Sequence, residues 1–186
     1  MTKLIGVGGG IASGKSTVGV IGKDMHFDII ETSEILTDEL EKDGFPTSDR
    51  VMRIAKAHEL TNKHGTRILG ELAAQKIKTM GLTRVMICGL RHPAQIEALK
   101  DHFKTAMCIY IDIDPAIQLQ RAIARGAIND PNEIKQLQKL IEDEASPDGN
   151  ISVHLPGTKA ICDHVVTNNT LSIESFTNVI RGILSK

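Results

Sequence analysis

The sequence predicts an α/β protein built on a five-stranded parallel sheet with helices on both faces. Five short apolar runs alternate with stretches of helical spacing, and a glycine-rich segment follows the first run. A chain of 186 residues is long enough to bury the core of one domain. We therefore expect a single three-layer domain that spans residues 1–186.

Five runs have the composition of buried parallel strands. They are short, apolar and rich in β-branched residues, as strands covered on both faces are. In chain order they are residues 3–8 (KLIGVG), 27–30 (FDII), 84–89 (RVMICG), 106–113 (AMCIYIDI) and 163–167 (DHVVT).

The stretches between these runs show helical spacing. Glycines near their ends and prolines near their starts, such as Gly44, Gly81, Pro93, Pro115 and Pro131, indicate helix boundaries. The predicted helices cover residues 16–25, 33–44, 49–65, 66–81, 93–103, 115–126, 131–145 and 172–184.

The glycine-rich segment GVGGGIASGKSTVGVIG, residues 6–22, fits one of two nucleotide-binding patterns. The dinucleotide pattern G-x-G-x-x-G fails at its third glycine in every register. The phosphate-loop pattern G-x-x-x-x-G-K-[ST] fits completely, with Gly9, Gly14, Lys15 and Ser16. The segment is therefore predicted to hold phosphate groups.

The chemistry of this loop suits a nucleoside triphosphate. Successive backbone N–H groups and the positive end of the following helix attract phosphate oxygens. Lys15 is placed to reach the β- and γ-phosphates, and the Ser16 hydroxyl is the candidate Mg²⁺ ligand. The predicted phosphate-binding residues are Gly9, Gly10, Ile11, Ala12, Ser13, Gly14, Lys15, Ser16 and Thr17.

Composition argues against several other functions. A net charge of −1 gives no general basic surface for nucleic acid, and one Tyr, four Phe and no Trp leave few base-stacking platforms. No apolar run approaches the length of a membrane span. Three widely spaced cysteines suggest reduced thiols, so we expect a cytoplasmic protein.

Beyond the loop, three segments resemble the nucleoside monophosphate kinases. Residues 31–36 (ETSEIL), 87–99 (ICGLRHPAQIEAL) and 111–126 (IDIDPAIQLQRAIARG) resemble their TGD-x-L, DG-x-R and lid-arginine segments. The loop GGGIASGKSTV looks like that of dephospho-CoA kinases, and residues 161–176 resemble both those kinases and small archaeal adenylate-kinase-related proteins. The resemblance implies a P-loop NTPase fold with a small helical lid at about residues 125–146. It also implies phosphoryl transfer from ATP, with Mg²⁺, to a small nucleotide-type acceptor.

The resemblance assigns roles to three arginines. Arg91 matches the arginine that grips the acceptor's phosphate, and a guanidinium fork suits that group. Arg121 and Arg125 share one helix face and match lid arginines that neutralise the transferred phosphoryl group. A solvated basic face would produce the same spacing.

Two further positions follow from the same resemblance. Glu34, or Glu31 three residues earlier, is expected to orient or deprotonate an acceptor hydroxyl, although a helix cap explains Glu34 equally well. Asn168 follows the last strand where related kinases contact adenine, and a plain loop explains it about as well.

Two departures from the family pattern bear on Mg²⁺ and on the acceptor's phosphate. Cys88 stands where the family has an acid that supports Mg²⁺, so another carboxylate is needed, and Asp112 and Asp114 are candidates. Thr37 replaces a second phosphate-gripping arginine, for which Arg50 or Arg53 are possible substitutes.

Four functions are compatible with these observations. The sequence favours an ATP-dependent nucleotide kinase, because Arg91 and the Arg121–Arg125 pair have no place in a simple switch. A dephospho-CoA kinase, a P-loop ATPase or switch without a small-molecule acceptor, and a nucleotide-binding protein with weakened catalysis are the alternatives. Neither the acceptor nor the oligomeric state follows from the sequence.

Overall fold

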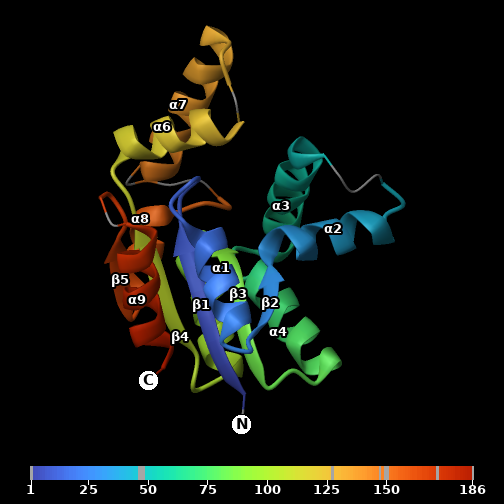
Figure 1. Cartoon of the computed structure of the whole chain (residues 1–186). Coiled ribbons are helices and arrows are strands. Elements are labelled where there is room, and N and C mark those ends of the chain that lie inside the picture. Colours follow the sequence, from blue (N-terminus) through green and yellow to red (C-terminus); the bar gives the residue numbers. More distant parts are fainter. Residues whose placement is uncertain are drawn as a thin grey trace.

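A sheet of five parallel strands forms the centre of the computed structural model (Figure 1), which describes residues 2–45, 49–126, 128–146, 148, 151–170 and 172–185. The strand order is β2-β3-β1-β4-β5, and every neighbouring pair is parallel. The predicted five-stranded parallel sheet is confirmed. The strands are β1 (Lys3–Gly9), β2 (Asp28–Glu31), β3 (Arg84–Leu90), β4 (Met107–Asp112) and β5 (His164–Thr167).

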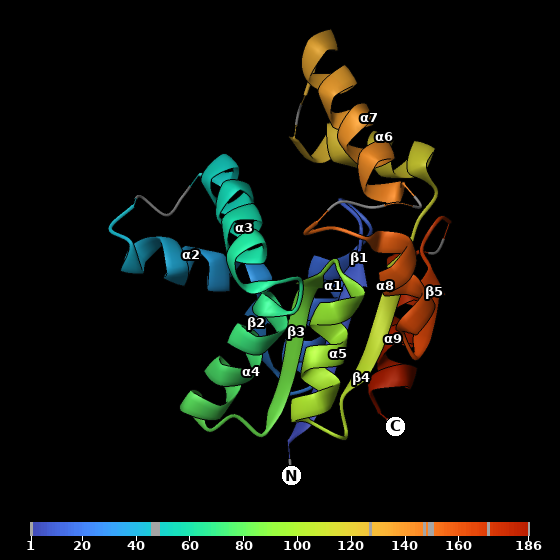
Figure 2. The ribbon, with the colours of Figure 1, turned by 180° about the vertical axis from the view of Figure 1, so that it is seen from behind.

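Helices cover both faces of this sheet. On one face, α1 (Lys15–Asp24) and α9 (Ile173–Leu184) pack over a core that includes Ile5, Val18 and Phe176. On the other face, seen in Figure 2, lie α4 (Ile68–Met80), α5 (Pro93–His102) and α8 (Leu155–Ile161). That second core includes Leu4, Ile87 and Leu99. The alternation of Leu4 and Ile5 between the two cores is the period of a strand buried on both faces.

The helix α8 was not predicted. It has only seven residues and contains a proline at its start and a glycine, so its sequence carries little helical periodicity. Contacts with α5, β1 and β4 hold it in place. Its position matters for the site because His154, its N-cap residue, donates a main-chain hydrogen bond to Arg91.

Two pairs of helices stand above the carboxyl ends of the strands (Figure 1). The pair α2 (Thr32–Lys42) and α3 (Arg50–His64) lies beside β2, and the pair α6 (Pro115–Gly126) and α7 (Pro131–Ala145) lies on the opposite side. The predicted lid, residues 125–146, consists mainly of α7, and its residue Ala127 lies outside the described residues. Lid motion stays a prediction. None of the described helices combines the length and apolar character needed to cross a membrane.

Candidate phosphate-binding site

The loop that joins β1 to α1 needs glycine at two positions. Gly9 has φ +141° and Gly14 has φ +111°, values that L side chains rarely adopt. A Cβ on Gly9 would lie 2.6 Å from the carbonyl oxygen of Ile111, and one on Gly14 would lie 2.6 Å from Nδ2 of Asn168. The conformation of the loop and its packing against β4 and the loop after β5 therefore depend on these two residues.

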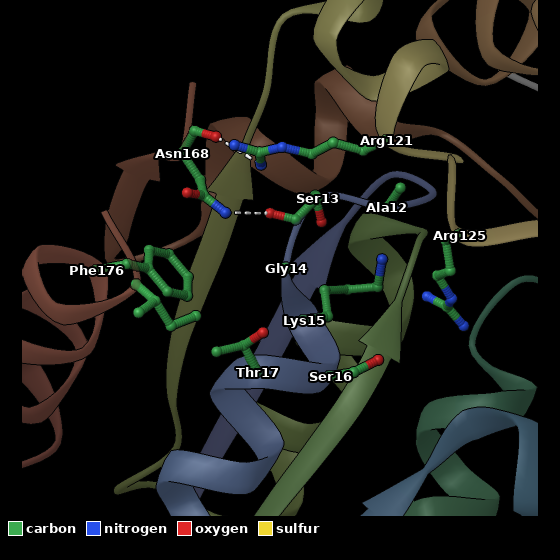
Figure 3. A pocket seen from close by; sticks show the side chains of 11 residues that line it. Ala12, Ser13, Gly14, Lys15, Ser16, Thr17, Arg121, Arg125, Asn168 and Phe176 are labelled. Carbon is green, nitrogen blue, oxygen red and sulfur yellow. Dashed lines mark hydrogen bonds between the residues drawn. The ribbon is translucent and has the colours of Figure 1, made fainter. Parts of the chain in front are cut away.

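A pocket of about 360 Å³ opens beside this loop (Figure 3). The first turn of α1 forms its floor, so the unpaired amides and the positive end of the helix dipole face the pocket. It is lined by Ala12, Ser13, Gly14, Lys15, Ser16, Thr17, Arg121, Arg125, Asn168, Ile173 and Phe176. Most of the predicted phosphate-binding residues thus line one cavity, together with both predicted lid arginines and Asn168.

Lys15 is held by a main-chain group of its own loop. Its Nζ donates a hydrogen bond to the carbonyl oxygen of Gly10. Burial, reinforced by the positive charge of Arg91, lowers the pKa of Lys15 from an ordinary value near 10.5 to about 7. The carboxylates of Glu144 and Glu31 favour its charged form, and an anion bound in the loop would stabilise that form further.

Arg121 and Asn168 join the loop after β5 to the phosphate loop (Figure 3). Arg121 donates from Nη1 to the carbonyl oxygen of Asn168 over 2.9 Å and from Nη2 to that of Asn169 over 3.1 Å. The Asn168 amide in turn donates to the carbonyl oxygen of Ser13 over 2.8 Å. In this structure Arg121 therefore supports the loop, and its role at a transferred phosphoryl group stays a prediction.

Arg125 occupies the other side of the pocket. Its side chain extends from the last turn of α6 on the side of the loop opposite Asn168 and Phe176 (Figure 3). The two lid arginines, although four residues apart on one helix, thus reach different sides of the pocket. The role of Arg125 at a transferred phosphoryl group likewise stays a prediction.

Arg91 lies just beyond the end of β3 and is fixed at three points. Its main-chain N–H donates to Oε1 of Gln95 over 3.0 Å, and its carbonyl oxygen accepts from the N–H of His154 over 2.8 Å. Its Nη1 donates to Oε1 of Glu144, a residue in the last turn of α7. Arg91 does not line the pocket beside the loop, but its charge acts on Lys15. The charges of Arg91, Glu144 and Lys15 therefore act on one another.

Cys88, which replaces the acid of the family pattern, has a carboxylate beside it on the adjacent strand. Glu31, the last residue of β2, is the parallel-sheet partner of Cys88. Burial, reinforced by Glu31, raises the pKa of the Cys88 thiol to about 12, so this side chain is a neutral thiol. Burial and Glu34 raise the pKa of Glu31, whereas Lys15 lowers it. Glu31 thus places a carboxylate within the electrostatic reach of the phosphate loop.

The other two candidate carboxylates have different partners. Oδ2 of Asp112 accepts a hydrogen bond from Lys159 on α8 over 2.8 Å. Asp114 accepts from the main-chain N–H of Ala116 over 2.9 Å and caps the start of α6. Among the described residues, no group of three or more His, Cys, Asp or Glu side chains is arranged to hold a metal ion. A metal here would depend on few protein ligands.

Glu34 and Arg53 lie together away from the loop. Glu34 is exposed, and its Oε2 accepts a hydrogen bond from the N–H of Glu31 over 3.3 Å at the start of α2. It also lines a second cavity of about 400 Å³ with Ser33, Thr37, Asp38, Arg53 and Lys76. Thr37 stands where the family pattern has a second phosphate-gripping arginine, and Arg53 is one of the residues predicted to substitute for it. This cavity brings the two together.

Several solved structures are similar to this fold. Shikimate kinase from Acinetobacter baumannii, solved in complex with shikimate, superposes with a TM-score of 0.57 over 100% of this chain and 94% of its own, at 17% identity. A gluconokinase from Sinorhizobium meliloti gives 0.52 over 97% and 90%, at 16% identity. An uncharacterized protein from Eubacterium ventriosum gives 0.63 over 100% and 99%, at 13% identity.

These similarities, together with the loop of residues 9–16, decide the fold. The chain has a P-loop kinase-like fold. No protein-family model matches the sequence. Similar proteins include a UPF0200 protein of Hyperthermus butylicus, 24% identical over 98% of this chain and 94% of its own, and one of Methanosarcina mazei, 26% identical over 100% and 95%. That name states no activity, so the similarity identifies relatives without identifying a substrate.

Two parts of this site were missed at the level of sequence. Ile173 and Phe176 form an apolar side of the pocket, and Phe176 is almost completely buried in α9. The sequence predicted this helix over residues 172–184, but its helical spacing gave no sign of a pocket. Glu144 was missed as well, because a carboxylate near the end of a helix rich in charged residues has no distinguishing local pattern.

Proposed function

We propose that this protein transfers the γ-phosphoryl group of ATP to a small nucleotide-type acceptor. The observation that carries the proposal is the pocket formed by the phosphate loop and Lys15, with Arg91 held at the end of the neighbouring strand β3. Ligands of open parallel sheets bind at this edge. A simple nucleotide switch has no need of a second anchored guanidinium there.

The donor side of the site fits ATP and Mg²⁺. The loop amides and Lys15 form a cradle for an anion, and Oγ of Ser13 is buried without a partner among the described residues. Ser16 and Glu31 are the residues that would hold Mg²⁺, which uses few protein ligands and keeps waters and phosphate oxygens. Bound Mg²⁺ would neutralise charge on the phosphate oxygens. Asn168, Ile173 and Phe176, which line the same pocket, are assigned to the nucleoside.

The acceptor side is assigned to Arg91 and to the region beside α2. A guanidinium held at one nitrogen retains other N–H groups for a phosphate or carboxylate. Glu34 and the cavity that it shares with Arg53 lie on the β2 side of the site, where an acceptor would approach from α2 and α3. Lys15 and Arg91 then separate the donor's phosphates from the acceptor's anionic group.

The reaction requires little covalent chemistry from the protein. An acceptor oxygen attacks the γ-phosphorus, the bond to the β–γ bridging oxygen breaks, and ADP leaves. Lys15, Arg125 and Arg91 stabilise the negative charge during this step, and the segment of residues 125–146 closes over it to exclude water.

A hydroxyl acceptor, as in the dephospho-CoA kinases that the loop resembles, is the second candidate. It is favoured by the two carboxylates, Glu31 and Glu34, at the end of β2. One of them would receive the hydroxyl proton as the oxygen attacks. A phosphate acceptor is already deprotonated and needs no base.

The deciding experiment measures ADP release from ATP with a panel of nucleoside monophosphates and dephospho-CoA. We expect release that depends on an acceptor and that falls by roughly two or more orders of magnitude in Lys15→Ala, as for other preorganised donors. The folded state of the variant is checked by thermal unfolding. Release that ignores every acceptor favours the ATPase alternative, and near-normal transfer by folded Lys15→Ala would refute the assignment of Lys15.

A further inference from the structure

The ion pair between Arg91 and Glu144 joins the sheet to the lid segment. Arg91 follows β3, whereas Glu144 belongs to the last turn of α7. The Glu144 side chain is only 5% exposed and that of Arg91 is 29% exposed. Within the described part of the chain, α7 has no other ion pair with the rest of the protein. The position of α7 and the orientation of the guanidinium are thus physically linked.

The contacts of Arg91 leave one edge of its guanidinium for a ligand. Gln95 and His154 hold its main chain, and Glu144 takes Nη1. Nε and Nη2 have no side-chain or carbonyl partner among the described residues. These two nitrogens form the edge that binds phosphate or carboxylate in a bidentate manner.

Stability alone gives a poor reason for Glu144 to be there. Burying a carboxylate is costly, and a buried ion pair is often no more stabilising than a pair of apolar side chains. The second oxygen, Oε2, is buried with no partner among the described residues, which adds to the cost. The presence of the Glu144 carboxylate is better explained by its effect on the orientation of Arg91.

We infer that Glu144 is a positioning residue, which orients Arg91 so that its Nε–Nη2 edge meets the anionic group of the acceptor. The inference rests on the proposed function, because it assumes that Arg91 binds the acceptor. Since Glu144 lies on α7, movement of this helix changes the orientation of Arg91. Acceptor binding and lid position are coupled through this one hydrogen-bonded pair.

A pair of matched variants isolates the hydrogen bond from the charge. Glu144→Gln and Glu144→Met both remove the negative charge and have similar length, but only glutamine can accept a hydrogen bond from Nη1. The probe is inorganic phosphate, titrated by calorimetry while a non-hydrolysable ATP analogue with Mg²⁺ fills the phosphate loop. Arg91→Met serves as the control that removes the guanidinium.

We expect Glu144→Gln to bind phosphate about tenfold or more tightly than Glu144→Met, the equivalent of one charge-assisted hydrogen bond. Affinities of the two variants that agree within about twofold would overturn the inference. If both variants instead bound phosphate more tightly than the wild type by the same factor, Glu144 would merely compete with phosphate for Arg91.

A second measurement does not depend on the reaction. The side-chain Nε–H signal of Arg91, assigned by its loss in Arg91→Lys, is followed by ¹⁵N-edited NMR without ligand. We expect a sharp signal in the wild type and in Glu144→Gln, and a broadened, faster-exchanging one in Glu144→Met and in the shorter Glu144→Asp. If Glu144→Met does not fold, Glu144→Asp decides the outcome, and a signal unchanged in Glu144→Asp overturns the inference.

The two measurements separate the inference from the proposed function. Wild-type protein that fails to bind phosphate beside the ATP analogue overturns the acceptor role of Arg91. The NMR comparison then still decides whether Glu144 orients the guanidinium. If the wild type binds phosphate but the Arg91 Nε–H signal does not change in the Glu144 variants, the opposite conclusion follows. Arg91 then binds the acceptor without help from Glu144.

Discussion

The side-chain amide of Asn168 donates a hydrogen bond to the main-chain carbonyl oxygen of Ser13 over 2.8 Å. This contact joins two loops that are far apart in sequence. Asn168 is buried, and its Nδ2 lies 2.6 Å from the place that a Cβ on Gly14 would occupy. The shape of the phosphate loop therefore depends on the loop after β5 as well as on its own glycines.

Replacing Asn168 by alanine is expected to weaken both the fold and nucleotide binding. The buried carbonyl of Ser13 would lose its donor, at a cost of about 1–3 kcal/mol in the free energy of unfolding. Urea unfolding and calorimetry with ATP measure the two effects. Asn178→Ala, on an exposed turn of α9, is the control that deletes the same amide without a buried contact. Equal behaviour of the two variants would contradict a structural role for the Asn168–Ser13 bond.

The lowered pKa of Lys15 predicts a proton linked to ATP binding. Without ligand the pKa is about 7, so at pH 8 most Lys15 side chains are neutral. Phosphates favour the ammonium and raise this pKa again, so binding at pH 8 takes up a proton, and affinity falls as pH rises above about 7. Calorimetry in two buffers of different ionisation enthalpy measures the uptake. Lys15→Met should abolish both effects, and unchanged proton uptake in this variant would assign the proton to another group.

Glu31 is predicted to support Mg²⁺ in place of the acid that Cys88 replaces. The two residues are partners across β2 and β3, so the carboxylate of Glu31 is displaced by only one strand. In Glu31→Gln we expect Mg²⁺ to improve the affinity for a non-hydrolysable ATP analogue about tenfold less than in the wild type, since a neutral amide is a weaker ligand. Asp28→Asn, at the other end of the same strand, is the control. A full Mg²⁺ effect in Glu31→Gln would point to another ligand.

Arg91 is predicted to serve the acceptor and not ATP. Arg91→Ala should raise the acceptor's KM or lower kcat by the equivalent of roughly 2–4 kcal/mol of transition-state binding, because a charge-assisted fork to an anion is lost. Arg91→Lys should recover only part of this loss. Calorimetry with ATP is run beside the kinetics. Loss of ATP binding with an unchanged acceptor dependence would instead place Arg91 on the donor side.

The fold was accessible from the sequence because its signals are local. Each strand carries a short apolar, β-branched run, and each long helix carries its own periodicity and boundary residues. The phosphate loop was equally accessible, since Gly9 and Gly14 adopt positive φ values that other residues avoid. The helix α8 was missed because its seven residues lack that periodicity and depend on packing against β1, β4 and α5.

The partners of the site's charged groups were decided by the tertiary structure. Arg121 and Arg125 look equivalent in sequence, yet Arg121 binds the carbonyls of residues 168 and 169 and Arg125 extends to the other side of the pocket. Glu144 meets Arg91 across 53 positions of the chain. The physical reason is that backbone periodicity and glycine conformation are properties of neighbouring residues, whereas the environment of a charge depends on which distant segments the fold brings beside it.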